Sequence, residues 1–249
     1  MVYRLEKLMG IHTAEAIVLR RYPFRETSVT LSCLTDVFGK LKGLVKGLRA
    51  QPNRYRSPME PATINRIVFY DTRTSQLHLM TQCELLSPLN GLQRDVETMR
   101  LTCLCLELVE TTVPLEEPQP AIYQLLRRTL ERLDGGPSVG AEALRVHFIV
   151  RLLRLVGFQP QLDRCTGCGA VVHLTGYWSA KQGGLLCQGC RYEDPRANAA
   201  APEMLSALEA LVESDAPVAL ERQVVLALRQ RLDEFLRWRL DRPLKTLTT

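Results

Sequence analysis

The first 84 residues place apolar and polar side chains in short, partly alternating runs, the pattern expected of half-buried β-strands. β-Branched residues are frequent within the runs, and turn-forming residues separate them. The predicted strands cover residues 14–20, 28–35, 40–48, 63–70 and 76–83. Five short strands of this kind suit a small, partly open barrel such as an OB-fold, although an SH3-like barrel gives a similar pattern.

From about residue 90 the apolar positions take up the spacing of an amphipathic helix. Residues 141–157 are apolar almost all round, which is typical of a helix at the centre of a bundle. Two further helices are predicted over residues 203–213 and 217–240, with Ser214 or Asp215 as the N-cap of the second.

The change of pattern divides the chain into four segments. Residues 1–84 form the predicted barrel, and residues 85–160 form the first part of a helical domain. Residues 161–197 are a cysteine-rich insertion, and residues 198–249 complete the helical domain. The predicted fold class is therefore α+β and multidomain: an N-terminal OB-fold β-barrel, then a helical domain interrupted by a four-cysteine zinc finger.

Two C-x-x-C pairs, Cys165 with Cys168 and Cys187 with Cys190, stand 18 residues apart. Two tight turns of this kind bring four sulfurs to the corners of a tetrahedron, and an all-thiolate tetrahedron suits one Zn²⁺. Four protein ligands leave no position for a catalytic water, so this zinc is expected to be structural. A redox pair and an iron site are the alternatives.

Glycines next to the paired cysteines are expected to supply left-handed backbone in the metal-binding turns: Gly167, Gly169 and Gly189. His173, between the pairs, is expected to be an ordinary histidine and not a ligand. The other four cysteines have apolar neighbours and are expected to be reduced and buried: Cys33, Cys83, Cys103 and Cys105.

The net charge of +5 is unevenly distributed along the chain. Residues 1–84 carry 13 Lys and Arg against 7 Asp and Glu, whereas the remaining segments lie close to neutrality. A basic surplus confined to one domain indicates a polyanionic partner at that domain.

Several function classes lack their sequence signatures. The chain has no G-x-x-x-x-G-K-[ST] phosphate loop, no H-E-x-x-H motif and no G-x-S-x-G motif. The sequence therefore predicts a binding protein, with no enzyme activity and no bound nucleotide. No apolar run approaches the roughly 20 residues that span a bilayer, and the N-terminus lacks a signal-peptide core. We expect a cytoplasmic location and no membrane partner.

The candidate nucleic-acid contacts lie between residues 25 and 56. Lys40, Lys42 and Lys46 share parity in the predicted third strand and so point to one face. The full candidate set adds arginines from the adjoining turns: Arg25, Lys40, Lys42, Lys46, Arg49, Arg54 and Arg56. Nearby aromatic residues could stack on bases: Tyr22, Phe24, Phe38 and Tyr55. The alternative is a solvated charged face with the aromatic rings in the core.

Four segments of the chain resemble the RecO family of bacterial recombination mediators. They are EAIVLRRYPFRETSVTLSCLTDVFGKLKGLVKGLRA (15–50), LHLMTQCELL (77–86), FIVRLLRLVGFQPQLDRCTGCG (148–169) and PLKTL (243–247). Lys46 and Arg49 fall in the family's K-G-x-R segment. The family often has further basic residues directly after that arginine, whereas Ala50 to Asn53 intervene here before Arg54.

The resemblance implies a DNA repair and recombination mediator that binds single- and double-stranded DNA. It implies annealing of complementary strands, including strands coated with single-strand binding protein (SSB). It also implies contact with the C-terminal tail of SSB, and action with RecR to help load recombinase. A zinc-ribbon adaptor that binds only protein, and a nuclease, are the alternatives.

Overall fold

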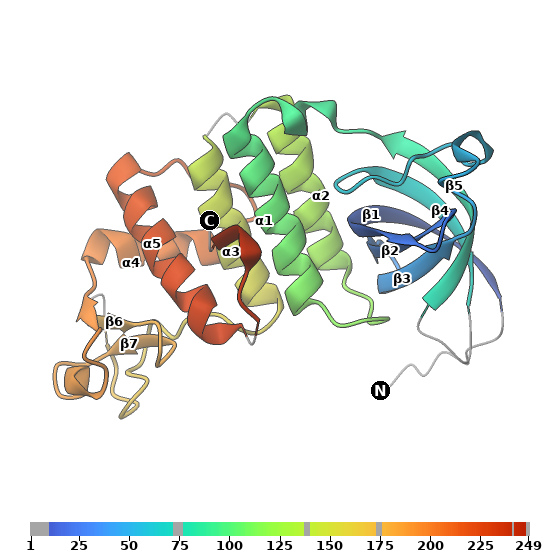
Figure 1. Ribbon diagram of the computed structural model, residues 1–249. Helices are drawn as coiled ribbons and strands as arrows, with labels where there is room; N and C mark the ends of the chain where they lie inside the picture. Colours follow the sequence, from blue (N-terminus) through green and yellow to red (C-terminus); the bar gives the residue numbers. More distant parts are fainter. Residues whose placement is uncertain (1–9, 72–76, 137–139, 173–175, 241, 248–249) are drawn as a thin grey trace. The chain divides into compact units, whose positions relative to one another are not determined.

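The computed structural model describes residues 10–71, 77–136, 140–172, 176–240 and 242–247 (Figure 1). The chain divides into two compact units. Residues up to 95 and residues 106–134 form the first unit, and residues 96–105 and 135–249 form the second. This division places residues 106–134 with the barrel, whereas the sequence pattern assigned them to the helical domain.

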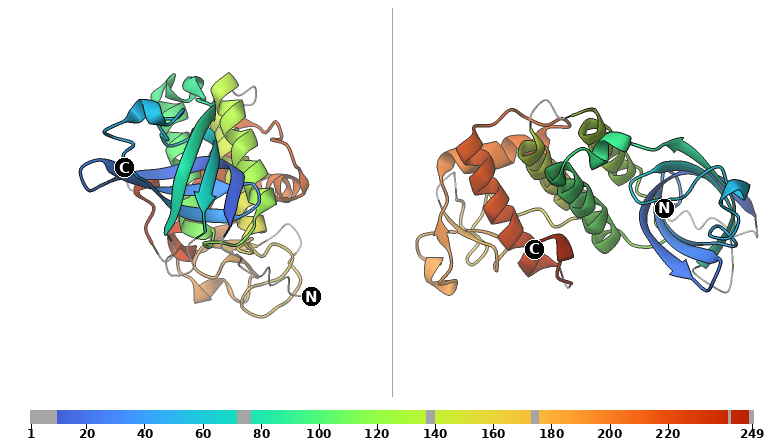
Figure 2. Two further views of the ribbon diagram at one scale, coloured as in Figure 1. Left: turned by 90° about the vertical axis from the view of Figure 1, so that its right-hand side faces the viewer. Right: turned by 45° about the horizontal axis from the view of Figure 1, so that its top comes forward.

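Five strands of the first unit close into a barrel, seen from two further directions in Figure 2. They are β1 Ile11–Phe24, β2 Ser28–Thr35, β3 Gly39–Val45, β4 Ile64–Tyr70 and β5 Leu77–Ser87. The order around the barrel is β1-β2-β3-β5-β4, with only β3 and β5 parallel among the paired strands. This closed five-stranded arrangement confirms the predicted OB-like barrel.

Alternating residues of the strands fill the barrel with a single apolar cluster. Its buried members are Ala14, Ala16, Val18, Val29, Leu31, Cys33, Leu41, Val45, Leu48, Tyr55, Met59, Ile67, Phe69, Met80 and Cys83. Leu48 belongs to this cluster because β3 ends at Val45 and the chain then turns. Lys46 therefore lies in the turn and not on the strand, as the parity argument had assumed.

Residues 106–134 of the same unit cover part of the outer surface of β1, β2 and β3. Helix α1 (Val96–Thr112) contributes Glu110, whose carboxylate accepts a hydrogen bond of 2.5 Å from Ser32. Arg20 on β1 lies 3.7 Å from Glu107 of the same helix. Helix α2 (Pro120–Gly135) contributes Tyr123 and Arg127, which both donate to Glu15.

Lys40 is buried by this cover, and its amine donates to the backbone carbonyl of Glu110. Burial lowers the pKa of Lys40, against the opposing influence of Glu110. The expectation that Lys40 is exposed beside Lys42 and Lys46 is wrong. Parity correctly placed its side chain outside the barrel, but α1 lies over that position.

Helices dominate the second unit: α3 Ala141–Leu155, α4 Pro202–Glu213 and α5 Arg222–Arg239. The three pack against one another, and ten of the 15 residues of α3 are buried. Helix α3 is thus the central helix that its apolar sequence predicted. None of the described helices is long and apolar enough to cross a membrane.

Helix α5 begins five residues later than predicted, after Glu221. Residues 214–221 connect α4 to α5, and the carboxylate of Asp215 pairs with Arg151 of α3. Asp215 therefore forms a surface ion pair with α3 and does not cap α5.

The cysteine-rich segment lies between α3 and α4. It has a small sheet of β6 Tyr177–Ser179, β7 Gly184–Leu186 and β8 Asn198–Ala199, in the order β7-β6-β8. Trp178 of β6 is buried, with its ring centroid 6.0 Å from that of Phe235 on α5. We call residues 161–199 the cysteine module. The contact between Trp178 and Phe235 packs this module against the helices of its unit.

Candidate metal centre and nucleic-acid interface

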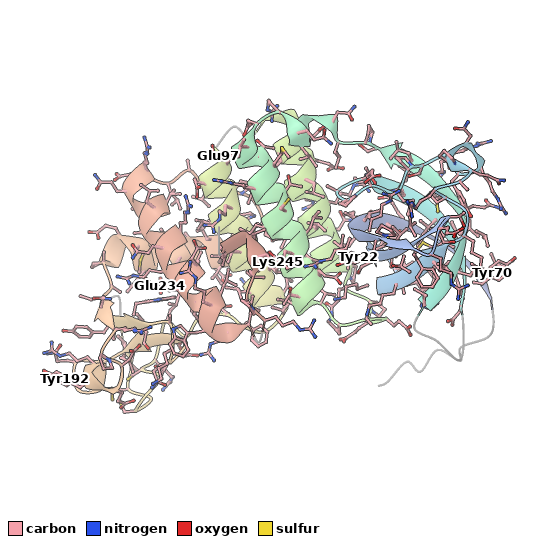
Figure 3. All side chains as sticks on the ribbon, viewed as in Figure 1. Tyr22, Tyr70, Glu97, Tyr192, Glu234 and Lys245 are labelled. Carbon is pink, nitrogen blue, oxygen red and sulfur yellow. The ribbon has the colours of Figure 1, made fainter. Side chains whose placement is uncertain are left out.

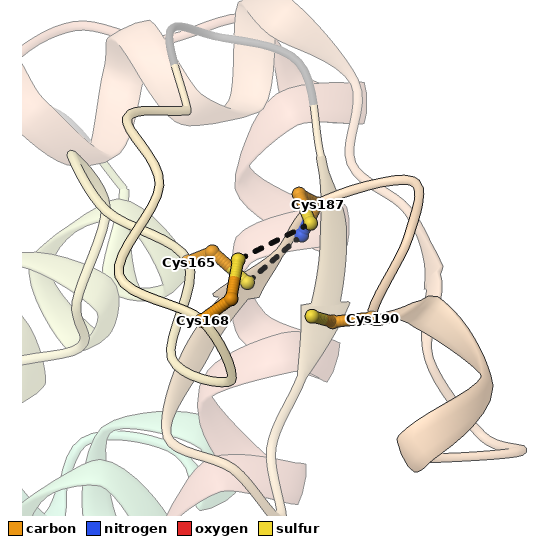
Figure 4. A group of neighbouring side chains, drawn as sticks. All are labelled: Cys165, Cys168, Cys187 and Cys190. Carbon is orange, nitrogen blue, oxygen red and sulfur yellow. Dashed lines mark hydrogen bonds between the residues drawn. The ribbon is translucent and has the colours of Figure 1, made fainter.

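The four paired cysteines converge in the cysteine module (Figure 4). Their sulfur atoms all lie within 4.8 Å of one another. Cys165 and Cys168 belong to a turn that residues 156–164 separate from α3, Cys187 directly follows β7, and Cys190 precedes a short 3-10 helix. Four sulfurs in this arrangement could hold one metal ion, which fits the predicted site.

Backbone N–H groups aim at the first sulfur of the cluster. The N–H of Cys187 donates to Sγ of Cys165 over 3.2 Å. Although desolvation acts to raise the pKa of Cys165, the N–H groups of Cys168, Cys187 and Gly167 lower it to about 6. The turn is thus built to favour a thiolate at Cys165.

The neighbouring thiols raise the pKa of the fourth cysteine, Cys190, instead of lowering it. Hydrogen bonds with Cys168 and Cys187 raise the pKa of Cys190 above its ordinary range. Sulfurs this close together cannot all carry a negative charge unless a cation offsets their repulsion. The donor set therefore suits a divalent metal that binds soft thiolates.

Only one of the three glycines in the turns has the expected left-handed backbone. Gly169 has φ +75° and its N–H donates to the carbonyl of Cys165. A Cβ at Gly167 would lie 2.9 Å from the Glu193 carboxylate, the end of a flexible side chain that can move aside. Gly189 shows neither constraint, so the expectation for these two residues is wrong. His173 lies outside the described residues.

The remaining cysteines divide by exposure. Cys33, Cys83 and Cys105 are buried as expected, whereas Cys103 is exposed on α1. Cys103 and Cys105 are two residues apart on one helix, so only one of them can face the core.

The other six candidate DNA contacts are exposed on the barrel: Arg25, Lys42, Lys46, Arg49, Arg54 and Arg56. Among the described residues, none of these six forms an ion pair with a carboxylate. Other arginines of the same unit are paired, such as Arg21 with Glu60 at 3.2 Å and Arg66 with Glu84 at 2.8 Å. The barrel cations without a described carboxylate partner thus lie in residues 25–56, the segment that the sequence predicts to contact nucleic acid.

Four of the six are brought together at the end of the barrel where β1 turns into β2. The guanidinium of Arg49 donates to the carbonyl of Arg25 over 3.4 Å. The hydroxyl of Tyr55 donates to the carbonyl of Lys46 over 2.8 Å, and Arg54 lies over the Tyr55 ring. We call Arg25, Lys46, Arg49 and Arg54 the barrel-end cluster.

Lys42 and Arg56 lie apart from that cluster. Lys42 is in the middle of β3, opposite Ser32 of β2 and Leu77 of β5. Arg56 runs beside Glu84 of β5, and its carbonyl accepts the N–H of Leu85 over 3.0 Å. The continuous lysine-lined strand expected from the sequence is therefore not present.

Two of the four candidate aromatic residues are core residues. Tyr55 is 6% exposed, and Phe38 packs on the barrel core with its ring centroid 5.3 Å from that of Phe69. Phe24 lies beside the barrel-end cluster, with Arg25 5.3 Å from its ring centroid. Tyr22 is 49% exposed and is labelled in Figure 3.

Sequence reasoning missed the outer face of β4 and β5. Arg66 and Tyr70 are exposed there on β4, and Gln82 is exposed on β5. The parity of Arg66 and Tyr70 within a strand can be read from the sequence, but the run of positive charge that marks the candidate residues ends at Arg56.

The barrel and the cysteine module together define a class of protein: an OB-like barrel with an unpaired cationic surface, joined to helices that carry four cysteines able to hold a metal ion. Two family descriptions match the chain, the N-terminal part of recombination protein O over residues 9–89 and its C-terminal part over residues 93–248. The chain belongs to the RecO family, which confirms the resemblance.

Individual relatives agree with this assignment. The chain is 34% identical to the DNA repair protein RecO of Desulforudis audaxviator over 206 residues, which cover 82% of this chain and 80% of the relative. It is 32% identical to the DNA repair protein RecO of Exiguobacterium sibiricum, covering 75% and 73%. The chain is 29% identical to the DNA repair protein RecO of a Nocardioides strain, and the match covers 95% of this chain and 98% of the relative.

Proposed function

We propose that this protein is a DNA repair and recombination mediator that binds single- and double-stranded DNA through its barrel. The barrel-end cluster carries the proposal: four cations lie together without a described carboxylate partner, in a member of the RecO family. Unpaired surface cations keep their full charge for a polyanion, and each phosphate that they neutralise releases counterions.

Annealing of complementary strands follows from the same electrostatics. Two single strands repel each other through their phosphates, and a cationic surface that holds both lowers this repulsion. The protein in this proposal also anneals strands coated with SSB, contacts the C-terminal tail of SSB and acts with RecR to help load recombinase. It is a binding protein of the cytoplasm, not an enzyme.

The cysteine module in this proposal holds one Zn²⁺ through Cys165, Cys168, Cys187 and Cys190. The metal would supply structure and no chemistry, because four thiolates complete a tetrahedral shell. Support comes from the four converging sulfurs and from the N–H groups that favour a thiolate at Cys165.

The test is binding of fluorescent single-stranded and duplex oligonucleotides at several salt concentrations, followed by annealing of complementary strands coated with SSB. Wild type is compared with a Lys46→Ala/Arg49→Ala double variant. If these residues neutralise two phosphates of a single strand, the slope of log affinity against log salt becomes less steep by about 1.4. Annealing should slow in parallel.

A matched control removes two exposed arginines from helices, Arg128→Ala/Arg222→Ala, and should leave the salt slope unchanged. Equal annealing by wild type and the barrel variant would exclude the barrel-end cluster. Absence of any salt-dependent DNA binding by wild type would favour the zinc-ribbon adaptor, and strand cleavage in Mg²⁺ would favour a nuclease.

A further inference from the structure

The outer face of β2 and β3 and the outer face of β4 and β5 differ in how accessible they are to a ligand. OB-folds commonly bind oligonucleotides on the face of their second and third strands. In this chain α1 covers the part of that face that holds Ser32, which bonds to Glu110, and Lys40, which is buried beneath the same residue. Glu107, close to Arg20, adds a second negative charge to the cover. DNA at the barrel end therefore has only part of this face open to it, around the exposed Lys42.

The outer face of β4 and β5 is open and basic. A groove of about 360 Å³ lies there, lined by Arg54, Arg56, Arg66, Val68, Thr81, Gln82, Cys83 and Glu84. Three arginines face one carboxylate, which leaves a net charge of +2 in the groove. The side-chain amide of Gln82 is exposed and makes no hydrogen bond among the described residues, so it is available to a ligand.

Register places the charges in a row across the sheet. Arg66 of β4 is the direct partner of Glu84 on β5, and Arg56 bridges to Glu84 from the other side. The pair of Arg66 and Glu84 is exposed, with side-chain accessibilities of 54% and 45%. An exposed pair of this kind contributes little to stability, so Glu84 weakens the positive potential of the groove without a large structural benefit.

The groove is continuous with the barrel-end cluster. Arg54 belongs to both, and its guanidinium lies 5.7 Å from the centroid of the Tyr55 ring. The Tyr55 hydroxyl in turn bonds to the carbonyl of Lys46. A strand bound at Lys46 thus meets Arg54 next, and then Arg56 and Arg66.

An aromatic side chain stands farther along the same strand face. Tyr70 is 43% exposed and has the parity of Arg66 and Val68 on β4 (Figure 3). Four residues of strand place it about 13 Å beyond Arg66. An exposed ring beside a cationic groove is a platform on which a base of a single strand can stack.

We propose that single-stranded DNA continues from the barrel-end cluster into the groove of β4 and β5. Arg56 and Arg66 bind its phosphates, Gln82 bonds to a base edge or phosphate, and Tyr70 stacks on a base. This inference rests on the proposed DNA binding and adds the direction of the path together with three residues outside the candidate set.

The test exploits the single negative charge in the groove. Glu84→Gln removes the carboxylate between Arg56 and Arg66, and should tighten binding of a fluorescent oligothymidine and make the salt slope steeper. Loss of folding cannot produce this gain. Arg66→Gln should weaken binding and reduce the slope by about 0.7. Tyr70→Leu should weaken binding by about fivefold or more with the slope unchanged.

Arg128→Gln, which removes one exposed charge from α2, is the control and should change neither quantity. If Glu84→Gln and Arg66→Gln both bind like wild type while Lys46→Ala/Arg49→Ala binds weakly, the groove is not on the path, although the proposed function stands. If wild type itself shows no salt-dependent binding, the proposed function fails first.

Discussion

The barrel buries fifteen residues in one apolar cluster, whereas the described part of the cysteine module buries only five large apolar side chains: Leu162, Val172, Trp178, Leu185 and Leu186. The module is also short, and segments below about 40 residues rarely fold on apolar burial alone. The barrel is therefore expected to fold through its core, and the module through its four sulfurs. The six exposed cations of the barrel without a described carboxylate partner take no part in that core, so they remain available for the proposed DNA binding.

Removal of the proposed zinc should have the largest effect, and only on the module. Structural zinc supplies on the order of 10 kcal/mol to small metal-dependent folds. A Cys187→Ser substitution, or a strong chelator, should open residues 161–199 to protease and change the near-ultraviolet signal of Trp178. The barrel should still bind DNA.

Thiol labelling gives a second readout of the same change. At pH 8 only Cys103 should react while the metal is bound, because Cys33, Cys83 and Cys105 are buried. Burial also raises the pKa of Cys83 to about 12 and keeps its thiol protonated. Chelation should release four more thiols. The control, Cys103→Ser, should leave the protease pattern unchanged. A Cys187→Ser protein whose module stays protease-resistant without metal would remove the distinction between the two regions.

A cavity in the barrel core should have the next largest effect. Phe69 is 2% exposed and contacts Phe38, His12 and His78 with its ring. Phe69→Ala should cost about 3–5 kcal/mol in the free energy of unfolding, measured by urea denaturation. Tyr70→Ala, one residue later on the exposed face, should cost far less. Equal losses from the two would contradict the core assignment.

Substitutions in the barrel-end cluster should have the smallest effect on stability. Arg49 is exposed and has no described carboxylate partner. Arg49→Ala should therefore change the free energy of unfolding by no more than about 0.5 kcal/mol, while DNA binding weakens. A melting temperature that falls as far as that of Phe69→Ala would mean that the arginine holds the turn and that its binding defect is indirect.

Local spacing was enough to predict the cysteine cluster, because each pair is set by one tight turn and the pairs repeat. The strands of the barrel were also predictable from alternation. Lys40 was not, because a residue 70 positions later covers it. Tyr55 was not either, since its burial depends on the turn after Val45. Both burials depend on contacts with other segments of the chain, and a local pattern of residues carries no information about such contacts.

Helix α1 is divided between the two units, with Val96–Cys105 in one and residues 106–112 in the other. This matters for the order in which the parts of the chain can fold as they emerge from the ribosome. The barrel strands are made first, but Glu15 can form its hydrogen bonds only after Tyr123 and Arg127 of α2 have been made. The first half of α1 can pack only much later, because the helices of its own unit continue to Arg239. Domains folding in turn during synthesis would therefore finish the barrel unit while the start of α1 is still unpacked. A barrel excised at residue 89 would lack Glu110 and expose Lys40, so an isolated DNA-binding fragment should extend to residue 134.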